Sequence, residues 1–531
     1  MKTVFLNRFL QILFISSFII TFSCSKDEDG PENPPISQED ATEFNAAMAQ
    51  LGEFTQPTEE PQQEVGDPEL ERDQENQTLE CATQLYKLSP GFDEMLTLDP
   101  STDVIYPGAM LKGETIPTGE YVGINLDRTP ITLSASLTNI SGSPVVTIEN
   151  PTLSTVREGI KQILDQEVTG ATAAKINYEI TQVYNEKHID VAIGVNYRGA
   201  GKKVSANVDF SSSQYKNTFV LKFLQQYYTI DMDPPGRNPS DLFTNLPNVD
   251  ALGSTSPVYV ASVAYGRMVI YTIETNSSLT EVNAAFDASV GSTDGSIDAS
   301  YAETINSSKI QALIIGGSGS GAAQTINGPA DVFKFISEGG NYSKESPGAP
   351  LSYKLRYIRK DFPIARQVLT TEYPIRTCYE AYQKYRIELG GIEMIDHAGE
   401  NGDLSLHGYL NIKLFQGGVL KASESYTRTR NNYISVREGV FWPIPGDETS
   451  EVELYKPSLE NDYVIIEAEF TEDDVFSSNE YLGKSSRKIF LKDIKSEFDD
   501  AGDLVPQPEI LELTEDSGSD FDVTFYVSRR Y

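Results

Sequence analysis

A strict two-residue alternation between Lys187 and Ser213 constrains this chain more than any other feature. Within it, apolar side chains recur at every second position along two arms, which the glycine-rich turn at 199–201 separates. Alternation of this kind is typical of an extended strand with one apolar face, and two such arms around glycines predict a β-hairpin. The apolar row consists of Ile189, Val191, Ile193, Val195 and Tyr197 in the first arm and of Val204, Ala206, Val208 and Phe210 in the second.

Periodicity alone leaves two interpretations of this hairpin open. The first is a half-exposed hairpin in an ordinary soluble sheet. The second is a transmembrane hairpin, because each arm has about the nine to eleven residues that a tilted strand needs to cross a bilayer. Gly194 and the glycines of the turn weaken the segment as a permanent strand. A segment that changes conformation tolerates them.

A second, weaker segment follows the same pattern between Thr280 and Ser307. After a turn at 292–295, apolar residues return at Ile297, Ala299 and Tyr301. A helix over 279–290 explains the first arm equally well, and a switch from helix to strand requires that both states be accessible. The apolar row of this first arm consists of Val282, Ala284, Phe286, Ala288 and Val290.

The overall composition describes an acidic, globular, multidomain protein. The chain has 531 residues, 39% hydrophobic and 23% charged, and its formal net charge is -36. Such a charge repels nucleic acids and anionic membrane surfaces, so we expect no nucleic-acid partner. If the protein binds a membrane, the contact must come from neutral lipids, sterols, glycans or a protein receptor.

The first 24 residues predict a bacterial lipoprotein signal. Lys2 and Arg8 precede an apolar run that is too short for a membrane span, and the run ends at Ser23-Cys24. We therefore expect export, with Cys24 acylated and the protein anchored to the outer membrane, exposed at the surface or released from it. The acidic residues at 25–29 resemble the tag that sends Bacteroidetes lipoproteins to the cell surface. An ordinary signal peptide with a coincidental cysteine is the alternative.

Composition also suggests the boundaries of the domains. Residues 25–76 are rich in Pro, Glu, Gln and Asp, which predicts a flexible acidic stalk with one marginal helix near 39–51. Residues 77–382 mix strand and helix patterns and form the predicted core. The pattern of residues 383–531 indicates short strands with frequent turns, which predicts an antiparallel β-sandwich.

Motifs for catalysis or metal binding do not emerge from the sequence. His188, His397 and His407 are the only histidines, and none has a metal-ligand spacing with Cys or Glu. The pair Gly316-Gly317 follows an apolar strand, but no Lys-Ser or Lys-Thr comes after it, as a phosphate-binding loop requires. We interpret the pair as a backbone hinge. The sequence therefore predicts no enzyme, no cofactor and no metal.

Two further cysteines, Cys81 and Cys378, remain after Cys24 is set aside. In an exported protein they form either a disulfide or two separate buried thiols, and counting does not decide between these.

Several separate motifs resemble one family in their order and spacing. The similarity covers Leu79 to Tyr382, and it points to the thiol-activated, cholesterol-dependent cytolysins, in particular to the CDC-like lipoproteins of Bacteroidetes. The motifs are VIYPGAMLKG, NLDRTPIT, QQYYTIDMD, TSPVYVASVAYGRMVIYTIET, ALIIGGS and SPGAPLSYKLRYIRKD.

The resemblance implies an α+β fold: an elongated, multidomain, MACPF/CDC-like cytolysin with a bent central antiparallel sheet, flanking helical clusters and a C-terminal β-sandwich. It implies discontinuous domains within 77–382 and two helical clusters, at 183–218 and 280–307, that unfurl into membrane-inserting hairpins. Gly316 and Gly317 correspond to the paired glycines at the strand bend. Cys81 and Cys378 correspond to strands of the domain that links core and sandwich, which favours the disulfide.

The C-terminal part departs from the family. Family members bind sterol through a Trp-rich undecapeptide that contains a Cys, together with a Thr-Leu pair. This chain has one tryptophan, Trp442, in EGVFWPIPG, and no undecapeptide. Phe441 and Trp442 are the only candidates for receptor contact, and the receptor itself stays open.

Two functions follow. The first is a pore-forming cytolysin that binds a target membrane, with sterol as one option, and assembles into ring oligomers. Each subunit then inserts two β-hairpins, alone or with a companion cytolysin-like protein. The second is a non-lytic surface lipoprotein of the same fold that adheres to glycans or proteins.

Overall fold

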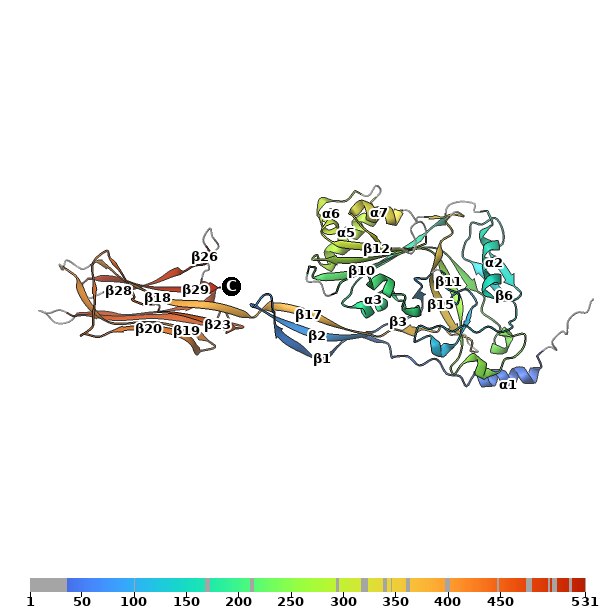
Figure 1. The fold of residues 1–531 in the computed structure, drawn as a ribbon, viewed down its shortest axis with the longest axis horizontal. Helices are drawn as coiled ribbons and strands as arrows, with labels where there is room; N and C mark the ends of the chain where they lie inside the picture. The colour runs from blue at the N-terminus through green and yellow to red at the C-terminus, as the bar shows by residue number, and fades with distance from the viewer. Residues whose placement is uncertain are drawn as a thin grey trace, which may run out of the picture.

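The molecule is elongated, with a mixed helix-and-sheet body at one end, a narrow three-stranded linker and a β-sandwich at the other end (Figure 1). The computed structural model describes residues 36–99, 101–167, 172–210, 214–292, 296–316, 323–337, 341–344, 346–359, 363–396, 402–446, 448–473, 480–494, 497–498, 504–514 and 518–530. Cys24, Gly317 and His397 lie outside these ranges. No helix among the described residues is long and apolar enough to cross a membrane.

The body is built on one antiparallel sheet, in which ten strands are described. Its two longest strands, β10 (Asn217–Met232) and β11 (Val258–Thr275), pair along most of their length. Both are rich in β-branched and aromatic residues, which suit a sheet that is covered on both faces. The other strands are β4 (Met95–Leu96), β5 (Met110–Leu111), β6 (Ile131–Ala135), β7 (Val145–Ile148), β9 (Lys175–Gln182), β12 (Lys309–Ile315), β13 (Ala323–Thr325) and β15 (Ala349–Tyr357).

The sheet changes partners at Gly266 of β11. Beyond this glycine β11 pairs with β12, and before it with β15. A Cβ on Gly316 would lie 2.6 Å from the Gly266 carbonyl oxygen, and a Cβ on Gly348 would lie 2.7 Å from the Gly266 Cα. Gly316 has φ +79, which favours glycine. Gly316, one of the two predicted hinge residues, therefore lies where the backbone of β11 leaves no room for a side chain, and its role as a hinge stays a prediction.

Helices cover both faces of the part of this sheet that lies toward the sandwich (Figure 1). One face packs against α3 (Glu186–Ile193), a 3-10 turn (Tyr197–Gly199) and α4 (Lys202–Ser205). The opposite face packs against α5 (Leu279–Gly291), α6 (Ala299–Asn306) and α7 (Pro329–Ser337). At the end of the body farthest from the sandwich, α2 (Leu153–Leu164) buries its apolar stripe on β6 and β7 (Figure 1).

The segment predicted as a flexible stalk is ordered where the structure describes it. Helix α1 (Gln38–Met48) starts at the N-cap Ser37 and buries Phe44 against Phe243, with 5.8 Å between the ring centroids. Strand β1 (Glu60–Arg72) then joins the linker sheet. The prediction of flexibility was wrong for this stretch because a few buried side chains and backbone pairing suffice to order it, although its average composition is polar.

The linker is a three-stranded antiparallel sheet in the order β1, β2 (Leu79–Ser89) and β17 (Thr371–Glu380). Short elements complete the body and the end of the chain. The strand pairs are β3 (Gly91–Phe92) with β16 (Gln367–Val368), β8 (Thr172–Ala173) with β14 (Asn341–Tyr342), and β26 (Glu497–Phe498) with β27 (Leu504–Val505). The remaining 3-10 helices are Gly113–Thr115, Pro239–Leu242, Val249–Leu252 and Leu491–Asp493.

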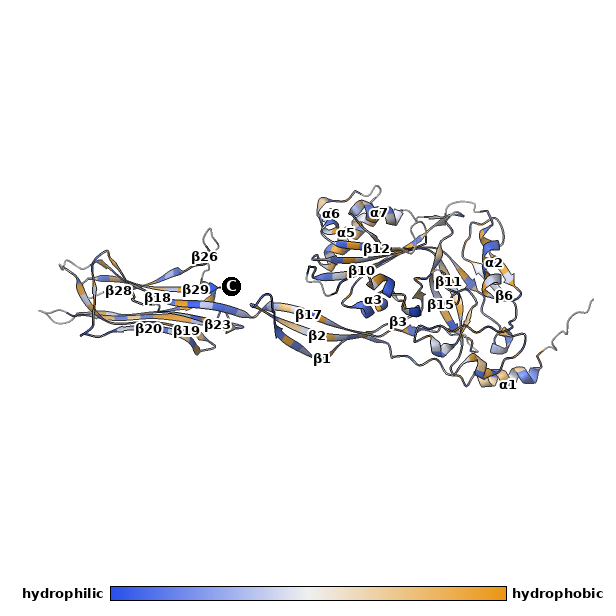
Figure 2. Ribbon diagram, in the orientation of Figure 1, coloured by the Kyte–Doolittle hydropathy of each residue, from blue (hydrophilic) through white to orange (hydrophobic). Residues whose placement is uncertain are grey.

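The C-terminal part is a β-sandwich of two antiparallel sheets, with five strands described in each. Apolar residues alternate with polar ones along its strands (Figure 2), as the burial pattern of β24 illustrates. The apolar rows of the two sheets meet in a single core. One sheet contains β18 (Tyr382–Asp396), β22 (Phe441–Pro443), β23 (Thr449–Tyr455), β28 (Gln507–Thr514) and β29 (Asp520–Arg530). The other contains β19 (Leu404–Gln416), β20 (Val419–Arg428), β21 (Ile434–Val436), β24 (Tyr463–Glu472) and β25 (Glu480–Phe490).

Candidate functional site

Both alternating segments are insertions between strands that already pair with each other. The first, 183–216, connects β9 to β10, and the second, 276–308, connects β11 to β12. Strands β9 and β10 are antiparallel neighbours, and so are β11 and β12. Each helical segment therefore occupies the place of a hairpin's outer end. Extending either pair of strands into the segment would lengthen an existing hairpin without changing the topology.

The register of β9 and β10 predicts the form of the first extended hairpin. Gln182 pairs with Phe219, and the Val183 N–H donates to the Thr218 carbonyl at 2.9 Å. Continuing this register residue by residue puts the turn at Ala200-Gly201. The same register places the apolar residues of the two arms opposite one another, in the pairs Val191–Phe210, Ile193–Val208, Val195–Ala206 and Tyr197–Val204.

The register of β11 and β12 gives a matching result for the second segment. Glu274 pairs with Lys309. Continuing from there puts the turn at 291–292, close to the turn expected at 292–295. The apolar pairs are Val282–Tyr301, Ala284–Ala299 and Phe286–Ile297, while Ala288 and Val290 extend the row toward the turn.

The register of β10 and β11 aligns the two extensions with each other. Asn217 pairs with Thr275. Continued outward, this register sets the second arm of the first hairpin beside the first arm of the second hairpin. The resulting neighbours are again apolar, in the pairs Phe210–Val282, Val208–Ala284, Ala206–Phe286 and Val204–Ala288.

All four apolar rows continue the same face of the existing sheet. Residues two apart on a strand share a face, so each row can be followed back into the strand that it extends. The rows lead to Val183 on β9, Val220 on β10, Ile270 on β11 and Leu313 on β12. These four residues belong to one cluster, on the face that α3 covers. Four extended arms would thus present one continuous apolar face and one polar face.

In the structure the first segment is helical, so the direct prediction of a resting β-hairpin was wrong and the helical cluster implied by the family resemblance is present. Helix α3 begins where the Asn185 side chain accepts the His188 N–H at 2.8 Å, and it ends at Gly194, whose φ is 72. Both are strong helix-capping signals. Of the predicted row, Ala206 is exposed and Val208 and Phe210 are partly buried. The buried members are Ile189, Val191, Ile193, Val195, Tyr197 and Val204.

The second segment is helical as well. Ser278 and Glu281 form a capping box at the start of α5. Val282 and Phe286, one helical turn apart, are buried, and Phe286 packs edge-on against Tyr271 at 5.4 Å between ring centroids. Ala284, Ala288 and Val290 are partly buried. On the exposed side, the Tyr178 hydroxyl of β9 donates to Asp287.

An aromatic stack holds α3 against the linker sheet. The buried His188 ring lies 4.1 Å from the Tyr373 ring of β17, and Tyr184 and Tyr86 stack on the same tyrosine at 5.2 and 6.2 Å. Burial lowers the pKa of His188 to about 4, so the imidazole is neutral at physiological pH. No local sequence pattern predicts this stack, because its members lie far apart along the chain.

Asp190 lies on the same helix, and burial shifts its pKa in the opposite direction. Burial, with Glu186 adding to the effect and Lys202 opposing it, raises the pKa of Asp190 to about 6. A Cβ on Gly201 would coincide with the Asp190 carboxylate, so the glycine of the predicted turn packs directly against this acid.

The linker strands are cross-linked. A disulfide joins Cys81 of β2 and Cys378 of β17, which are directly opposite in the register, with 4.0 Å between their Cα atoms. Asp73 lies beside the sulfurs, but both sulfurs are used in the bond, so this cluster offers no thiolate to a metal.

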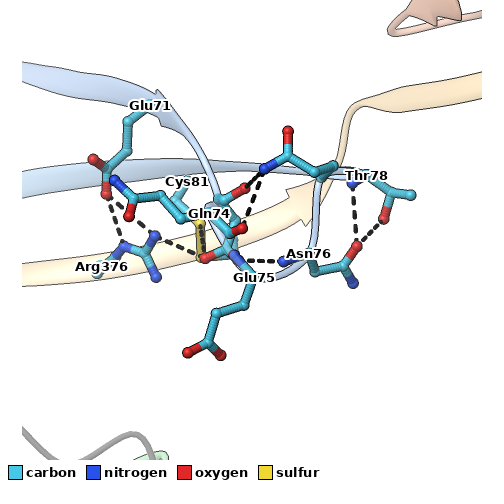
Figure 3. A network of polar contacts seen from close by, with 10 residues as sticks. Glu71, Gln74, Glu75, Asn76, Thr78, Cys81 and Arg376 are labelled. Carbon is cyan, nitrogen blue, oxygen red and sulfur yellow. Dashed lines mark hydrogen bonds and ion pairs between the residues drawn. A yellow bond between two sulfur atoms is a disulfide. The ribbon is translucent and has the colours of Figure 1, made fainter.

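A polar network surrounds the disulfide (Figure 3). Arg376 forms ion pairs with Glu71 at 3.2 Å and with Asp73 at 2.9 Å. Hydrogen bonds from the Asn76 backbone N–H and from Arg376 lower the pKa of Asp73. This network fastens the turn between β1 and β2 to β17.

A second polar cluster fastens the sandwich to the linker. The Glu80 carboxylate of β2 accepts hydrogen bonds from Lys456 at 2.8 Å and from the Tyr455 hydroxyl at 2.7 Å, and Tyr379 donates to it as well. The Lys456 contact, followed by those of the two tyrosines, lowers the pKa of Glu80 to about 2. Arg72 adds an ion pair to Glu453 at 2.6 Å.

The end of the sandwich farthest from the linker carries exposed apolar side chains. Phe441 lies opposite Glu393 on the outer face and is 41% exposed, with Ile395 and Val440 also exposed nearby. Trp442 instead packs against the sandwich core, 6.0 Å from the Tyr426 ring. Of the two receptor candidates, Phe441 is therefore the more exposed, and Trp442 is partly buried.

Comparisons with known proteins agree with this architecture. The family model described as thiol-activated cytolysin matches residues 67–382. The chain is 30% identical over 325 residues to tetanolysin of Clostridium tetani, a match that covers 59% of this chain and 60% of tetanolysin. It is 30% identical over 311 residues to pneumolysin of Streptococcus pneumoniae, covering 56% of this chain and 64% of pneumolysin. The sequence match thus spans less than two thirds of these relatives.

Solved structures extend the similarity of fold to nearly the whole chain. The human-specific toxin intermedilysin matches with a TM-score of 0.53 and 23% identity, over 92% of this chain and 99% of that protein. Wild-type pneumolysin matches with a TM-score of 0.52 and 21% identity, over 85% and 94%. At such identities the likeness concerns the fold alone. It includes the C-terminal sandwich, which the family model leaves unmatched.

Proposed function

This chain belongs to the thiol-activated cytolysin family, whose members are pore-forming toxins and not enzymes, and on that premise we propose that it forms pores by inserting two β-hairpins per subunit. The inserted segments are 183–218 and 280–307. Before insertion the protein binds a target membrane through the sandwich, 383–531, and assembles into a ring through the core, 77–382. We further propose that it is exported through its 1–24 signal and lipid-anchored at Cys24.

One observation carries this proposal: three independent strand registers, continued outward, all bring apolar residue opposite apolar residue on a single sheet face. A shift of one residue in any register would reverse the faces of one arm. A lipid-facing sheet needs this agreement among all four arms.

Energetics support assembly before insertion. A membrane-spanning strand at an open edge leaves about five backbone groups unpaired, and each costs several kcal/mol in hydrocarbon. Burying five apolar side chains returns about 1.5 to 3 kcal/mol each. The edges of one subunit must therefore be paired by its neighbours, which favours a ring that forms on the surface first.

The test uses a vesicle that needs no receptor. Six histidines inserted between Asn431 and Asn432 attach the protein to a nickel-chelating lipid. The turn follows the C-terminal end of β20. The N-terminal end of β20, Val419, pairs with Gln416, which donates to the Tyr455 carbonyl at the linker. The turn therefore lies at the end of the sandwich away from the linker, which is the proposed membrane-facing end. Release of a trapped dye reports pore formation.

The first prediction compares two neighbouring substitutions. Ala206→Asp places a charge in the lipid-facing row, and we expect at least a tenfold slower release, because a carboxylate in hydrocarbon costs several kcal/mol. Asn207→Asp faces the aqueous side and should reduce release less than twofold. Ala206 is exposed in the soluble state and Asn207 partly exposed, so neither change should unfold the protein. Ile193 is fully buried in the soluble state, so a charge there would also destabilise the folded protein, and a loss of release could not be assigned to the membrane step.

Native gels and electron microscopy of the bound protein provide the control. Both variants should form rings as wild type does. Equal release by the two variants, or no release by tethered wild type, would contradict the proposal and leave the non-lytic adhesion protein as the better account. The exposed Phe441 end of the sandwich is compatible with adhesion also.

A further inference from the structure

The turn of the first hairpin carries an unusual concentration of positive charge. Arg198, Lys202 and Lys203 lie within six residues, and no acidic residue occurs between Asp190 and Asp209. In the whole chain acidic residues outnumber basic ones by 78 to 42. The second segment is different: residues 280–308 contain no Lys or Arg, and its turn region contains Asp294.

The register places these cations just beyond the apolar part of the hairpin. With the turn at Ala200-Gly201, Arg198 lies directly opposite Lys203, and Lys202 follows the turn itself. The apolar row from Ile189 to Tyr197 spans nine residues, within the length of about nine to eleven residues that a tilted strand needs to cross the hydrocarbon core. When this row lies in hydrocarbon, the three cations lie at the headgroups of the far leaflet.

In the soluble state the same cations have local partners. Lys203 Nζ donates to the Leu98 carbonyl at 3.4 Å, and the Arg198 guanidinium lies 5.0 Å from the Tyr197 ring centre. After a hydrogen bond from Ser101, the charges of Lys203 and Arg198 help to lower the pKa of Asp99. The charge of Lys202 opposes the rise in the pKa of Asp190. Arg198 also has φ 46, a left-handed conformation that a long side chain rarely adopts.

Extension of the hairpin removes these partners. Arg198 and Lys203 then become a directly opposed pair of like charges, which destabilises an antiparallel pair unless an anion is present. Phosphate-bearing headgroups are such anions, and Arg and Lys bind them well.

We propose that the turn formed by Arg198, Lys202 and Lys203 binds anionic phospholipid headgroups of the leaflet on the far side of the target membrane, and that this binding drives insertion to completion. The inference rests on the proposed hairpin insertion. It adds a dependence on the difference between the two leaflets. The acidic protein binds best to a membrane whose near leaflet is neutral, and its basic turn binds best to a far leaflet that is negatively charged.

The experiment uses two asymmetric vesicles and the histidine-tethered full chain. Both have a phosphatidylcholine outer leaflet with the nickel-chelating lipid. The inner leaflet is phosphatidylcholine alone in one and contains about a third phosphatidylserine in the other. Each cation near an anionic surface is worth about a factor of five in binding, so we expect dye release to be several-fold faster with phosphatidylserine inside.

Two matched double variants identify the charges responsible. Arg198→Gln with Lys203→Gln should release dye at one rate from both vesicles. Lys187→Gln with Lys216→Gln removes two exposed charges at the base of the same hairpin and should keep the wild-type acceleration. Circular dichroism checks that both variants fold.

The outcomes separate this inference from the proposed function. Equal release of wild type from both vesicles, or an unchanged acceleration in the Arg198/Lys203 variant, would overturn the inference while leaving pore formation intact. Absence of release from either vesicle would contradict the proposed function and with it this inference.

Discussion

At the scale of single residues, His188 and Asp190 show how the soluble packing of α3 depends on pH. The folded state lowers the pKa of His188 from 6.5 to about 4, so its stabilising contribution is complete above pH 6.5 and is lost as the pH falls toward 4. The folded state raises the pKa of Asp190 from 3.8 to about 6, so the folded state is favoured below pH 3.8 and this preference is lost as the pH rises through 6. The two residues thus respond to pH in opposite directions.

His188→Phe tests the first of these effects. Phenylalanine keeps the ring stack on Tyr373 and removes Nδ1, which has no hydrogen-bond partner among the described residues. At pH 5 the wild type has lost about 2 kcal/mol through this histidine, so the variant should be more stable by about that amount. At pH 7.5 the difference should be within about 1 kcal/mol. Urea unfolding at both pH values measures it, and the same difference at both would contradict the assignment.

At the scale of secondary-structure elements, one sequence carries signals for two conformations. In α3 the caps Asn185 and Gly194 favour the helix, whereas the two-residue period from Ile189 to Tyr197 favours a strand. Periodicity therefore located both segments and the members of their apolar rows. It did not identify their resting conformation, because caps and burial against the sheet decide that in the folded protein.

Other features could not be predicted from the sequence, for a different reason. The order of α1 and β1 depends on a few contacts, such as Phe44 with Phe243, that an average over composition hides. The stack on Tyr373 and the Glu80–Lys456 cluster join residues hundreds of positions apart, and no local pattern marks them. Cys81 and Cys378 were found because cysteines are few, and the family resemblance, not their spacing, favoured the pair.

The disulfide between β2 and β17 leads to a prediction about the stability of the linker. Replacing Cys81 and Cys378 together by Ser should lower the free energy of unfolding by about 2–4 kcal/mol, because the bond closes a long loop in the unfolded chain. The linker sheet has little core of its own, with β1 mostly exposed, so limited proteolysis should cut it first. Chemical denaturation and mass spectrometry of the fragments test this. Unchanged stability, or free thiols in the exported wild type, would contradict it.

At the scale of the whole molecule, the proposed function assigns separate tasks to the sandwich, the linker and the body. The exposed end of the sandwich lies at one extreme of the long axis and the helical segments lie in the body at the other (Figure 1). The linker between them is stiffened by the disulfide and fastened to the sandwich through Glu80. The proposed insertion would require the segments to leave two hydrophobic clusters, at a cost that is met only where neighbouring subunits pair the strand edges.

The most direct test of this account is a scan with an environment-sensitive dye on single cysteines from 189 to 197 and from 204 to 210. It uses a Cys24→Ser background, where the disulfide leaves no other thiol, and protein tethered to vesicles. The account predicts that the dye enters hydrocarbon at odd positions in the first arm and at even positions in the second, because the register of β9 and β10 sets both rows on one face. The same parity in both arms, or no alternation at all, would contradict it.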